Sequence, residues 1–197
     1  NADFAQIRFL DYPIGKEIVR VDRSGDEVHV VGKEALQVKK DRSYYLKAIE
    51  LEEGEIHFSP INLNREFGKI SQPLMPTLRI SKPIFYQGEL TGVIVINTDL
   101  TKLFSRLKNT VGAAYNLEIL NEDGFYILHN TVDSSFIFEF GNAQPQSDPS
   151  HFNAQAEVIN LPELIISKHR ISADIMGYDL LYQISTDREV LMRSYNT

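Results

Sequence analysis

The sequence predicts an α+β fold made of two small domains, each with an antiparallel sheet. Strand-like segments follow one another through short turns, and no regular alternation of strands and helices is present. Two stretches, Gly92–Asp99 and Gly177–Asp187, each lead from an apolar strand through a Thr-Asp pair into a helix. A chain of 197 residues with 43% hydrophobic residues can bury one large core or two small ones.

The first element is expected to be the end of an N-terminal helix over residues 1–11. Phe4, Ile7 and Leu10 have the spacing of one helical face, and a proline follows shortly after them. The start Asn1-Ala2 resembles the remnant of a cleaved tag, so we interpret the chain as a fragment of a longer protein.

Strands are predicted where apolar and polar residues alternate between turn residues. The predicted strands are residues 17–22, 28–31, 55–59, 78–86, 90–98, 117–120, 125–129, 164–171 and 178–184. Short turns rich in glycine, aspartate and asparagine join several of them in pairs, which indicates β-hairpins. Two PAS-like domains fit this order of elements best.

Helices are predicted at three further places. One starts after a cap at Asp41 and ends near Gly54, and its buried face is Tyr44, Tyr45, Ala48 and Ile49. A second follows Asp99 directly, with Leu100, Leu103, Phe104 and Leu107 on one face. A third ends the chain. Residues 61–76 lack periodicity, which predicts a loop long enough to cover a site, and a polar loop is predicted over 142–150.

The pattern restarts at Thr110-Val111-Gly112, which suggests a domain boundary there. We expect a first domain over residues 12–110 and a second over residues 111–197. The repeated Thr-Asp ending suggests two copies of one α/β unit, although a short match of this kind can also arise by chance.

Composition excludes several classes of function. A formal charge of −7 argues against a nucleic-acid surface and disfavours an anionic membrane surface. Apolar runs such as Val93–Ile96 are far shorter than the roughly 20 residues of a membrane helix. The chain has no cysteine, and its five histidines lack metal-ligand spacing. No phosphate loop or nucleophile motif is present, so we expect no metal, no cofactor and no enzyme activity.

Several motifs resemble one family, the double Cache sensor domains. The likeness to the membrane-distal module rests on Arg42-Ser43-Tyr44-Tyr45, Ser59-Pro60, Pro83-Ile84-Phe85 and Gly92–Leu100. The segment Leu120–His129 resembles the membrane-proximal module. The resemblance implies the periplasmic or extracellular part of a bacterial receptor that is anchored in the inner membrane and forms a homodimer. A histidine kinase, chemoreceptor or diguanylate cyclase output would then lie outside this chain.

The resemblance also implies a ligand site in the first domain. Arg42, beside Tyr44 and Tyr45, matches the position that holds a ligand carboxylate, and Asp99 matches the position that holds an ammonium. This sequence departs from the pattern at Gln37, where a tyrosine is usual, and at Tyr44, where a tryptophan is usual. Around residues 61–64 the family's tyrosine and aspartate are absent. We therefore expect a small polar or anionic ligand such as a carboxylate or related polar metabolite, with amino acids as a minority case.

The candidate ligand-binding residues are Arg42, Tyr44, Tyr45, Asn62, Arg79, Asn97 and Asp99. Structural roles remain open for several of them. Arg42 could pair with an acid on an exposed helix, and one of the two tyrosines could belong to the core. Asp99 could simply cap the following helix, since Asp187 has the same place in the second half.

The sequence leaves three functions to consider. The first is a sensor that binds a small molecule and relays a change of shape to the membrane. The second is an interaction module that docks a periplasmic binding protein and has no pocket of its own. The third is a hydrolase, for which the sequence offers no nucleophile paired with a base.

Overall fold

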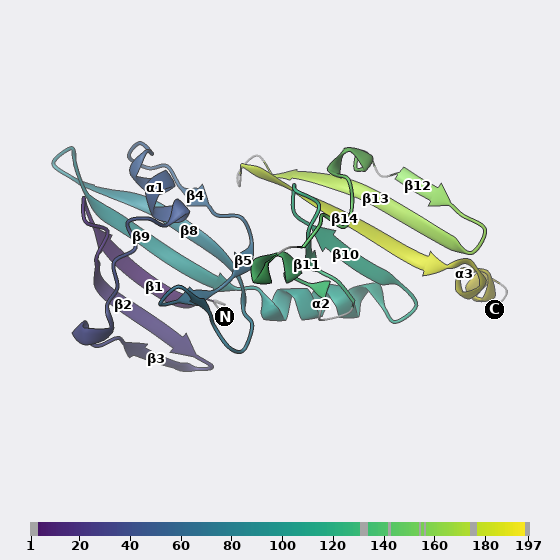
Figure 1. Cartoon of the computed structure of the whole chain (residues 1–197), viewed down its shortest axis with the longest axis horizontal. Helices are drawn as coiled ribbons and strands as arrows, with labels where there is room; N and C mark the ends of the chain where they lie inside the picture. The colour runs from purple at the N-terminus through teal and green to yellow at the C-terminus, as the bar shows by residue number, and fades with distance from the viewer. Residues whose placement is uncertain are drawn as a thin grey trace. The chain divides into compact units, whose positions relative to one another are not determined.

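The chain forms two compact units, residues 1–100 and 101–197. The computed structural model describes residues 4–130, 134–141, 143–153, 155, 157–173 and 177–195. Each unit is built on an antiparallel sheet (Figure 1), so the predicted α+β class is confirmed. Helix α2 (Thr101–Val111) falls in the second unit, whereas the sequence placed it at the end of the first domain.

The sheet of the first unit has the strand order β3-β2-β1-β9-β8-β4, and β5 also pairs with β8. Its strands are β1 (Phe4–Asp11), β2 (Glu17–Ser24), β3 (Glu27–Val30), β4 (His57–Phe58), β5 (Asn62–Leu63), β8 (Pro76–Tyr86) and β9 (Glu89–Asp99). Strand β9 lies between β1 and β8 and runs antiparallel to both. The predicted β2-β3 and β8-β9 hairpins are confirmed.

The N-terminal segment is a strand, so the predicted N-terminal helix is wrong for the described residues. Strand β1 pairs with both β2 and β9, and its buried residues Gln6, Arg8 and Leu10 alternate as they do on one face of a sheet. The spacing that suggested a helix covers fewer than three turns. Pairing with the next strand, β2, on one edge and with the distant strand β9 on the other decided the conformation, because it satisfies the backbone groups of β1 on both edges.

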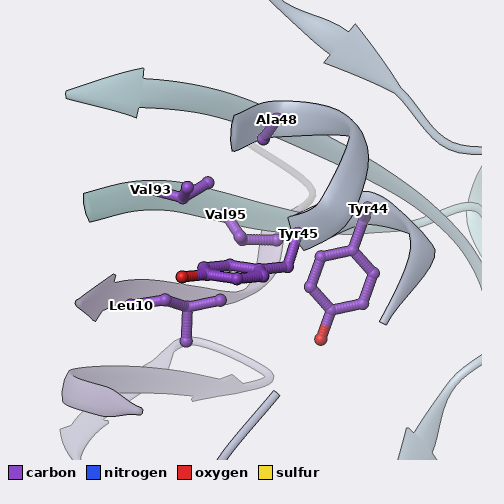
Figure 2. Close-up of a cluster of buried hydrophobic side chains, with 6 residues drawn as sticks. All are labelled: Leu10, Tyr44, Tyr45, Ala48, Val93 and Val95. Carbon is purple, nitrogen blue, oxygen red and sulfur yellow. The ribbon is translucent and has the colours of Figure 1, made fainter. Parts of the chain in front are cut away.

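Helix α1 (Ser43–Ile49) packs against β4, β8 and β9. Arg42 is its N-cap rather than the predicted Asp41, and no side chain caps the helix. The helix also ends at Ile49, earlier than predicted. Its buried side chains join one core cluster, formed by Leu10, Tyr44, Tyr45, Ala48, Val93 and Val95 (Figure 2).

The segment predicted as a long loop contains short pieces of sheet. Strand β5 joins β8, while β6 (Arg65–Glu66) and β7 (Lys69–Ile70) form a small separate hairpin. This hairpin positions Glu66 near the first sheet, where its carboxylate accepts hydrogen bonds from Gln6 of β1, Arg20 of β2 and Gln37 of the segment before α1.

The second unit has a sheet of order β11-β10-β14-β13-β12. Its elements are α2, β10 (Asn116–Leu120), β11 (Tyr126–Leu128), β12 (Glu157–Asn160), β13 (Leu164–Ala173), β14 (Tyr178–Asp187) and α3 (Arg188–Tyr195). Short 3-10 turns occur in this unit at Ile137–Phe140 and Pro149–His151, and in the first unit at Lys33–Ala35. The predicted β10-β11 hairpin and C-terminal helix are confirmed, while β12 was not predicted. Leu120, Phe152 and Leu181 form its buried cluster, with Tyr126 against it.

No helix in the described part of the chain combines the length and the apolar character that crossing a membrane requires.

Candidate functional site

A polar cavity of about 350 Å³ lies in the first unit, beside the N-terminal end of α1. The described residues that line it are Arg8, Lys39, Asp41, Arg42, Ser43, Tyr44, Ser59, Asn62, Leu63, Asn64, Arg65, Arg79 and Asn97. Five of these side chains are cationic and one is a carboxylate. The carboxylate, Asp41, is exposed on the turn before α1. The lining therefore favours an anion.

Five of the seven predicted residues line this cavity, namely Arg42, Tyr44, Asn62, Arg79 and Asn97. Tyr45 does not: its side chain is 1% exposed, and its hydroxyl donates to the Asp11 carbonyl at 2.9 Å. Figure 2 shows its ring between Leu10 and the β9 valines, with Tyr44 at the side of this cluster. Asp99 also lies outside the lining, opposite Thr77 at the end of β9. Ligand binding by any of the seven remains a prediction.

Sequence reasoning missed two buried cations of the lining, Arg8 and Lys39, and the buried lining residues Ser59 and Asn64 are not among the seven candidates. Arg8 was overlooked because the N-terminal segment was interpreted as a helix, whereas Arg8 lies on the buried face of strand β1. Its alternation with Gln6 and Leu10 was the signal that could have revealed it. Lys39 lies in irregular chain between Val38, which bridges to Lys16, and α1, where no sequence period applies.

A partly buried ionic network adjoins the cavity and is centred on Glu66. Arg20 donates to Glu66 at 2.8 Å, and the side-chain amides of Gln6 and Gln37 donate to it at 2.9 Å each. Arg8 lies 3.7 Å from Glu66 and 3.5 Å from Glu17. Burial acts to raise the pKa of Glu66, but these hydrogen bonds and charges outweigh it and lower that pKa to about 2. Glu66 is therefore ionised, and its negative charge compensates the positive charges of Arg8 and Arg20.

Lys39 is a buried cation with few partners. Its side chain is 3% exposed, and its ammonium donates to Gln37 Oε1 at 2.9 Å. Burial, followed by the nearby positive charge of Arg8, lowers the pKa of Lys39 to about 8, although Glu66 and Glu17 act in the opposite direction. An ammonium has three donors, and within the described residues this one makes a single hydrogen bond.

Arg42 is half-buried at the N-cap of α1. No residue in the described part of the chain hydrogen-bonds or ion-pairs with its guanidinium group. A guanidinium group binds a carboxylate through two parallel hydrogen bonds. Arg42 is thus available to a ligand that enters the cavity, whereas Arg8 is held by carboxylates behind it.

Tyr44 and Arg79 form one wall of the cavity. The Arg79 guanidinium lies over the Tyr44 ring, 5.7 Å from its centroid, and also bonds Asn62. Arg8 donates to the Tyr44 hydroxyl at 3.5 Å. The backbone of Arg79 is held by a hydrogen bond of 3.0 Å from its N–H to the Ser59 hydroxyl. This wall is pre-organised by contacts within the protein.

A chain of hydrogen-bonded amides links Gln6, which lies outside the lining, to the lining residues Asn97 and Asn64. Asn97 Nδ2 donates to Gln6 Oε1 at 2.9 Å and to Asn64 Oδ1 at 3.2 Å. Asn64 in turn donates to the Ser71 hydroxyl at 3.0 Å. Two buried atoms, Asn97 Oδ1 and Arg8 Nε, have no hydrogen-bond partner among the described residues. Such atoms are costly to leave unpaired, which makes a polar ligand favourable here.

The polar groups of the cavity are suited to binding an anion. Within the described ranges, no three His, Cys, Asp or Glu side chains come together as a metal would require. Its cations and amides can instead bind an anion that also carries hydrogen-bonding groups.

Comparison with known proteins identifies relatives of the whole chain. Residues 2–157 match the family described as bacterial histidine kinase, sensor domain. The chain resembles the extracellular domain of vpHK1S-Z8, a protein assigned as a histidine kinase. The TM-score is 0.80 and the identity 27%, over 99% of this chain and 72% of that one. The comparison with curated proteins finds no match.

Two further solved structures have similar folds. A domain of a protein assigned to the sensory box/GGDEF family from Vibrio parahaemolyticus has a TM-score of 0.77 and 27% identity, over 96% of this chain and 74% of that one. The ligand-binding domain of Mlp24, solved with asparagine, has a TM-score of 0.61 and 15% identity, over 98% of this chain and 72% of that one. At that identity the likeness concerns the fold alone.

Proposed function

Because the chain belongs to the bacterial histidine kinase sensor-domain family, we propose that its first unit binds a small anionic molecule in the Arg42 cavity. The family assignment confirms the predicted sensor domain for signal transduction, which is not itself an enzyme. The resemblance to Cache-type sensors also agrees with the solved relatives.

The observation that carries this proposal is the charge of the cavity lining. Lys39 and Arg42 face the same space, and within the described residues neither has a carboxylate hydrogen-bonded to its side chain. An anion would supply the missing acceptors to both, and burial would strengthen each charged hydrogen bond. An amino acid fits less well, because Asp41 is the lining carboxylate and lies at the exposed edge.

We further propose that the chain is the periplasmic or extracellular part of a receptor anchored in the inner membrane and active as a homodimer. Ligand binding would favour one conformation of the first unit, and the second unit would relay it to a kinase, chemoreceptor or cyclase output. The extracellular origin of the vpHK1S-Z8 domain supports this location.

The alternative function, docking of a periplasmic binding protein, expects side chains to fill this region of the first unit. A lined cavity of about 350 Å³ favours a small-molecule site instead.

Titration calorimetry of the purified chain with a panel of organic and inorganic anions tests the proposal. Replacing Arg42 by alanine should weaken binding of any anion in the cavity by roughly 10- to 100-fold, the value of a charged hydrogen bond. Lys82→Ala is the matched control, because Lys82 is an exposed cation of β8 outside the cavity lining. A bound anion whose affinity is equal in the wild type and the Arg42→Ala variant would refute this site.

A further inference from the structure

We propose that the ligand is a hydroxy acid whose carboxylate contacts Lys39 and Arg42 and whose hydroxyl group donates a hydrogen bond to Asn97 Oδ1. This inference rests on the proposed function, since it names the chemical class that the same cavity selects. All three side chains line that cavity.

The orientation of the Asn97 amide follows from the ionised Glu66. A carboxylate only accepts hydrogen bonds, so the Gln6 amide nitrogen must be the group that faces Glu66, at 2.9 Å. Gln6 Oε1 then accepts from Asn97 Nδ2 at 2.9 Å and also from Arg8. Reversing the Asn97 amide would place two oxygens against each other. Asn97 therefore presents Oδ1, and not its nitrogen, as its remaining polar atom.

Asn97 Oδ1 needs a donor that the described residues do not supply. The Asn97 side chain is 1% exposed, and this oxygen has no hydrogen-bond partner among them. A ligand that supplies a donor gives this buried acceptor a hydrogen bond, which favours its binding. The ligand should accordingly carry an O–H or N–H group at this point.

The surroundings of Asn97 favour a neutral donor over an ammonium group. Arg8 and Asn97 bond the same oxygen of Gln6, which brings a guanidinium close to the donor position. The nearest carboxylates of the network, Glu66 and Glu17, already compensate Arg8 and Arg20. An added positive charge would be repelled by Arg8, and the carboxylate of the lining, Asp41, lies at the exposed edge of the cavity; a hydroxyl group would not be repelled.

The anionic end of the ligand has two ready contacts. The Lys39 ammonium makes one of its three possible hydrogen bonds within the described residues, and the Arg42 guanidinium makes none there. Lys39 is buried and Arg42 is half-buried, so the carboxylate can be held between a deep and a shallow cation. A carboxylate with a neighbouring hydroxyl group matches this arrangement of two cations and one acceptor.

Matched ligands test the inference on the wild-type chain. L-malate, L-aspartate and succinate share one carbon skeleton and differ only in a hydroxyl, an ammonium or a hydrogen at one carbon. Lactate, alanine and propionate form the same series with a single carboxylate. Calorimetry should give the hydroxy acid of at least one series an affinity at least about tenfold above both of its analogues, because one buried hydrogen bond distinguishes them.

The substitution Asn97→Ala tests whether Asn97 causes the preference for a hydroxy acid. In Asn97→Ala, the ratio of hydroxy-acid to unsubstituted-acid affinity should fall to about one, since the acceptor of the hydroxyl group is absent. Asn116→Ala is the control, because Asn116 is an exposed amide on β10 in the second unit, and it should leave the ratio unchanged. If Asn97→Ala does not fold, the ligand series on the wild type still decides the question.

The outcomes separate this inference from the proposed function. Equal binding of a hydroxy acid and its unsubstituted analogue, or tighter binding of the amino acid, would overturn the inference and leave an anion site in place. Failure of both series to bind would also overturn it, while loss of phosphate or another anion in Arg42→Ala would still support the proposed function. A preference that persists in Asn97→Ala would overturn the proposed contact between the hydroxyl group and Asn97 Oδ1.

Discussion

The two sheets share a run of four strands in the same order. One end of these strands has the same role in both units, and the other end has a different role in each. The run β2-β1-β9-β8 of the first unit corresponds to the run β11-β10-β14-β13 of the second. In both, the central strand ends at an aspartate, Asp99 or Asp187, and a helix follows. Counting back from these aspartates aligns the two sheets residue by residue.

The apolar end is alike in both units. Six positions before the aspartate, Val93 pairs with Leu10 in the first sheet, and Leu181 pairs with Leu120 in the second. All four side chains are buried in the core cluster of their unit. This end of each sheet serves packing.

The other end contributes Arg8 and Asn97 to the cavity lining in the first unit and forms a closed hydrogen-bond cluster in the second. Arg8, Gln6 and Asn97 correspond in register to Glu118, Asn116 and Ser185. Glu118 accepts from Tyr126 at 3.4 Å and from Gln183, and lies 3.3 Å from His129. Burial and this carboxylate raise the pKa of Tyr126 to about 12. In the first unit, Arg8 Nε and Asn97 Oδ1 have no hydrogen-bond partner among the described residues and can bind a ligand. In the second unit, Glu118 at the position of Arg8 is bound by Tyr126, Gln183 and His129.

The largest expected effect comes from removing the cation that distinguishes the first unit. Arg8→Ala should lower the free energy of unfolding by about 3 to 5 kcal/mol, because it leaves the buried Glu17 without its counter-charge. Glu118→Gln in the second unit should cost only about 1 kcal/mol, since an amide keeps part of its hydrogen bonding. Urea unfolding measures both. Equal losses would mean that the two positions do not differ as described.

Acid should destabilise the first unit through Glu66. Its folded pKa of about 2 lies below its ordinary value of 4.5, so its contribution is fully present above pH 4.5 and is lost as the pH falls through 2. The contribution is on the order of 2 to 3 kcal/mol after allowance for partial exposure of the side chain.

Glu66→Gln should therefore be less stable than the wild type at pH 7, with a difference that shrinks toward pH 2. Unfolding by urea across this range measures the difference. Glu122→Gln, an exposed acid of the second unit, serves as the control. A difference that is independent of pH would contradict the assignment of the low pKa to Glu66.

The smallest expected effect is a loss of anion affinity in alkaline solution. A bound anion favours the protonated form of Lys39. The pKa of Lys39 in the free protein is about 8, so this side chain loses its proton in mildly alkaline solution. Affinity should be constant below pH 7 and fall by about tenfold near pH 9, as Lys39 loses its proton in the free protein. Calorimetry in buffers of different ionisation enthalpy would also detect proton uptake on binding near pH 8.

Lys39→Met should remove this dependence on pH and weaken binding at pH 7. Lys40→Met is the matched control, because Lys40 is the exposed neighbour outside the cavity lining. A wild-type affinity that does not change between pH 7 and pH 9 would exclude Lys39 from the anion contact.

Local patterns predicted most of the hairpins and part of the site. Alternation over β8 and β9, and the turn between β10 and β11, depend on residues close in sequence, so the sequence alone identified them. Five of the seven candidate residues line the cavity. The resemblance supplied Arg42 and Tyr44, while period-two alternation on β9 placed Asn97.

The sequence by itself determined the α+β class, the two-unit organisation around paired hairpins and the sensor family. Only the tertiary structure decided that the N-terminal segment is a strand, because one edge of β1 is stabilised by pairing with β9, which lies far along the chain. That pairing brings Arg8 and Gln6 beside Asn97, while the β6-β7 hairpin supplies Glu66. The cavity's charge and its open acceptor come from contacts between distant segments, which no local spacing encodes.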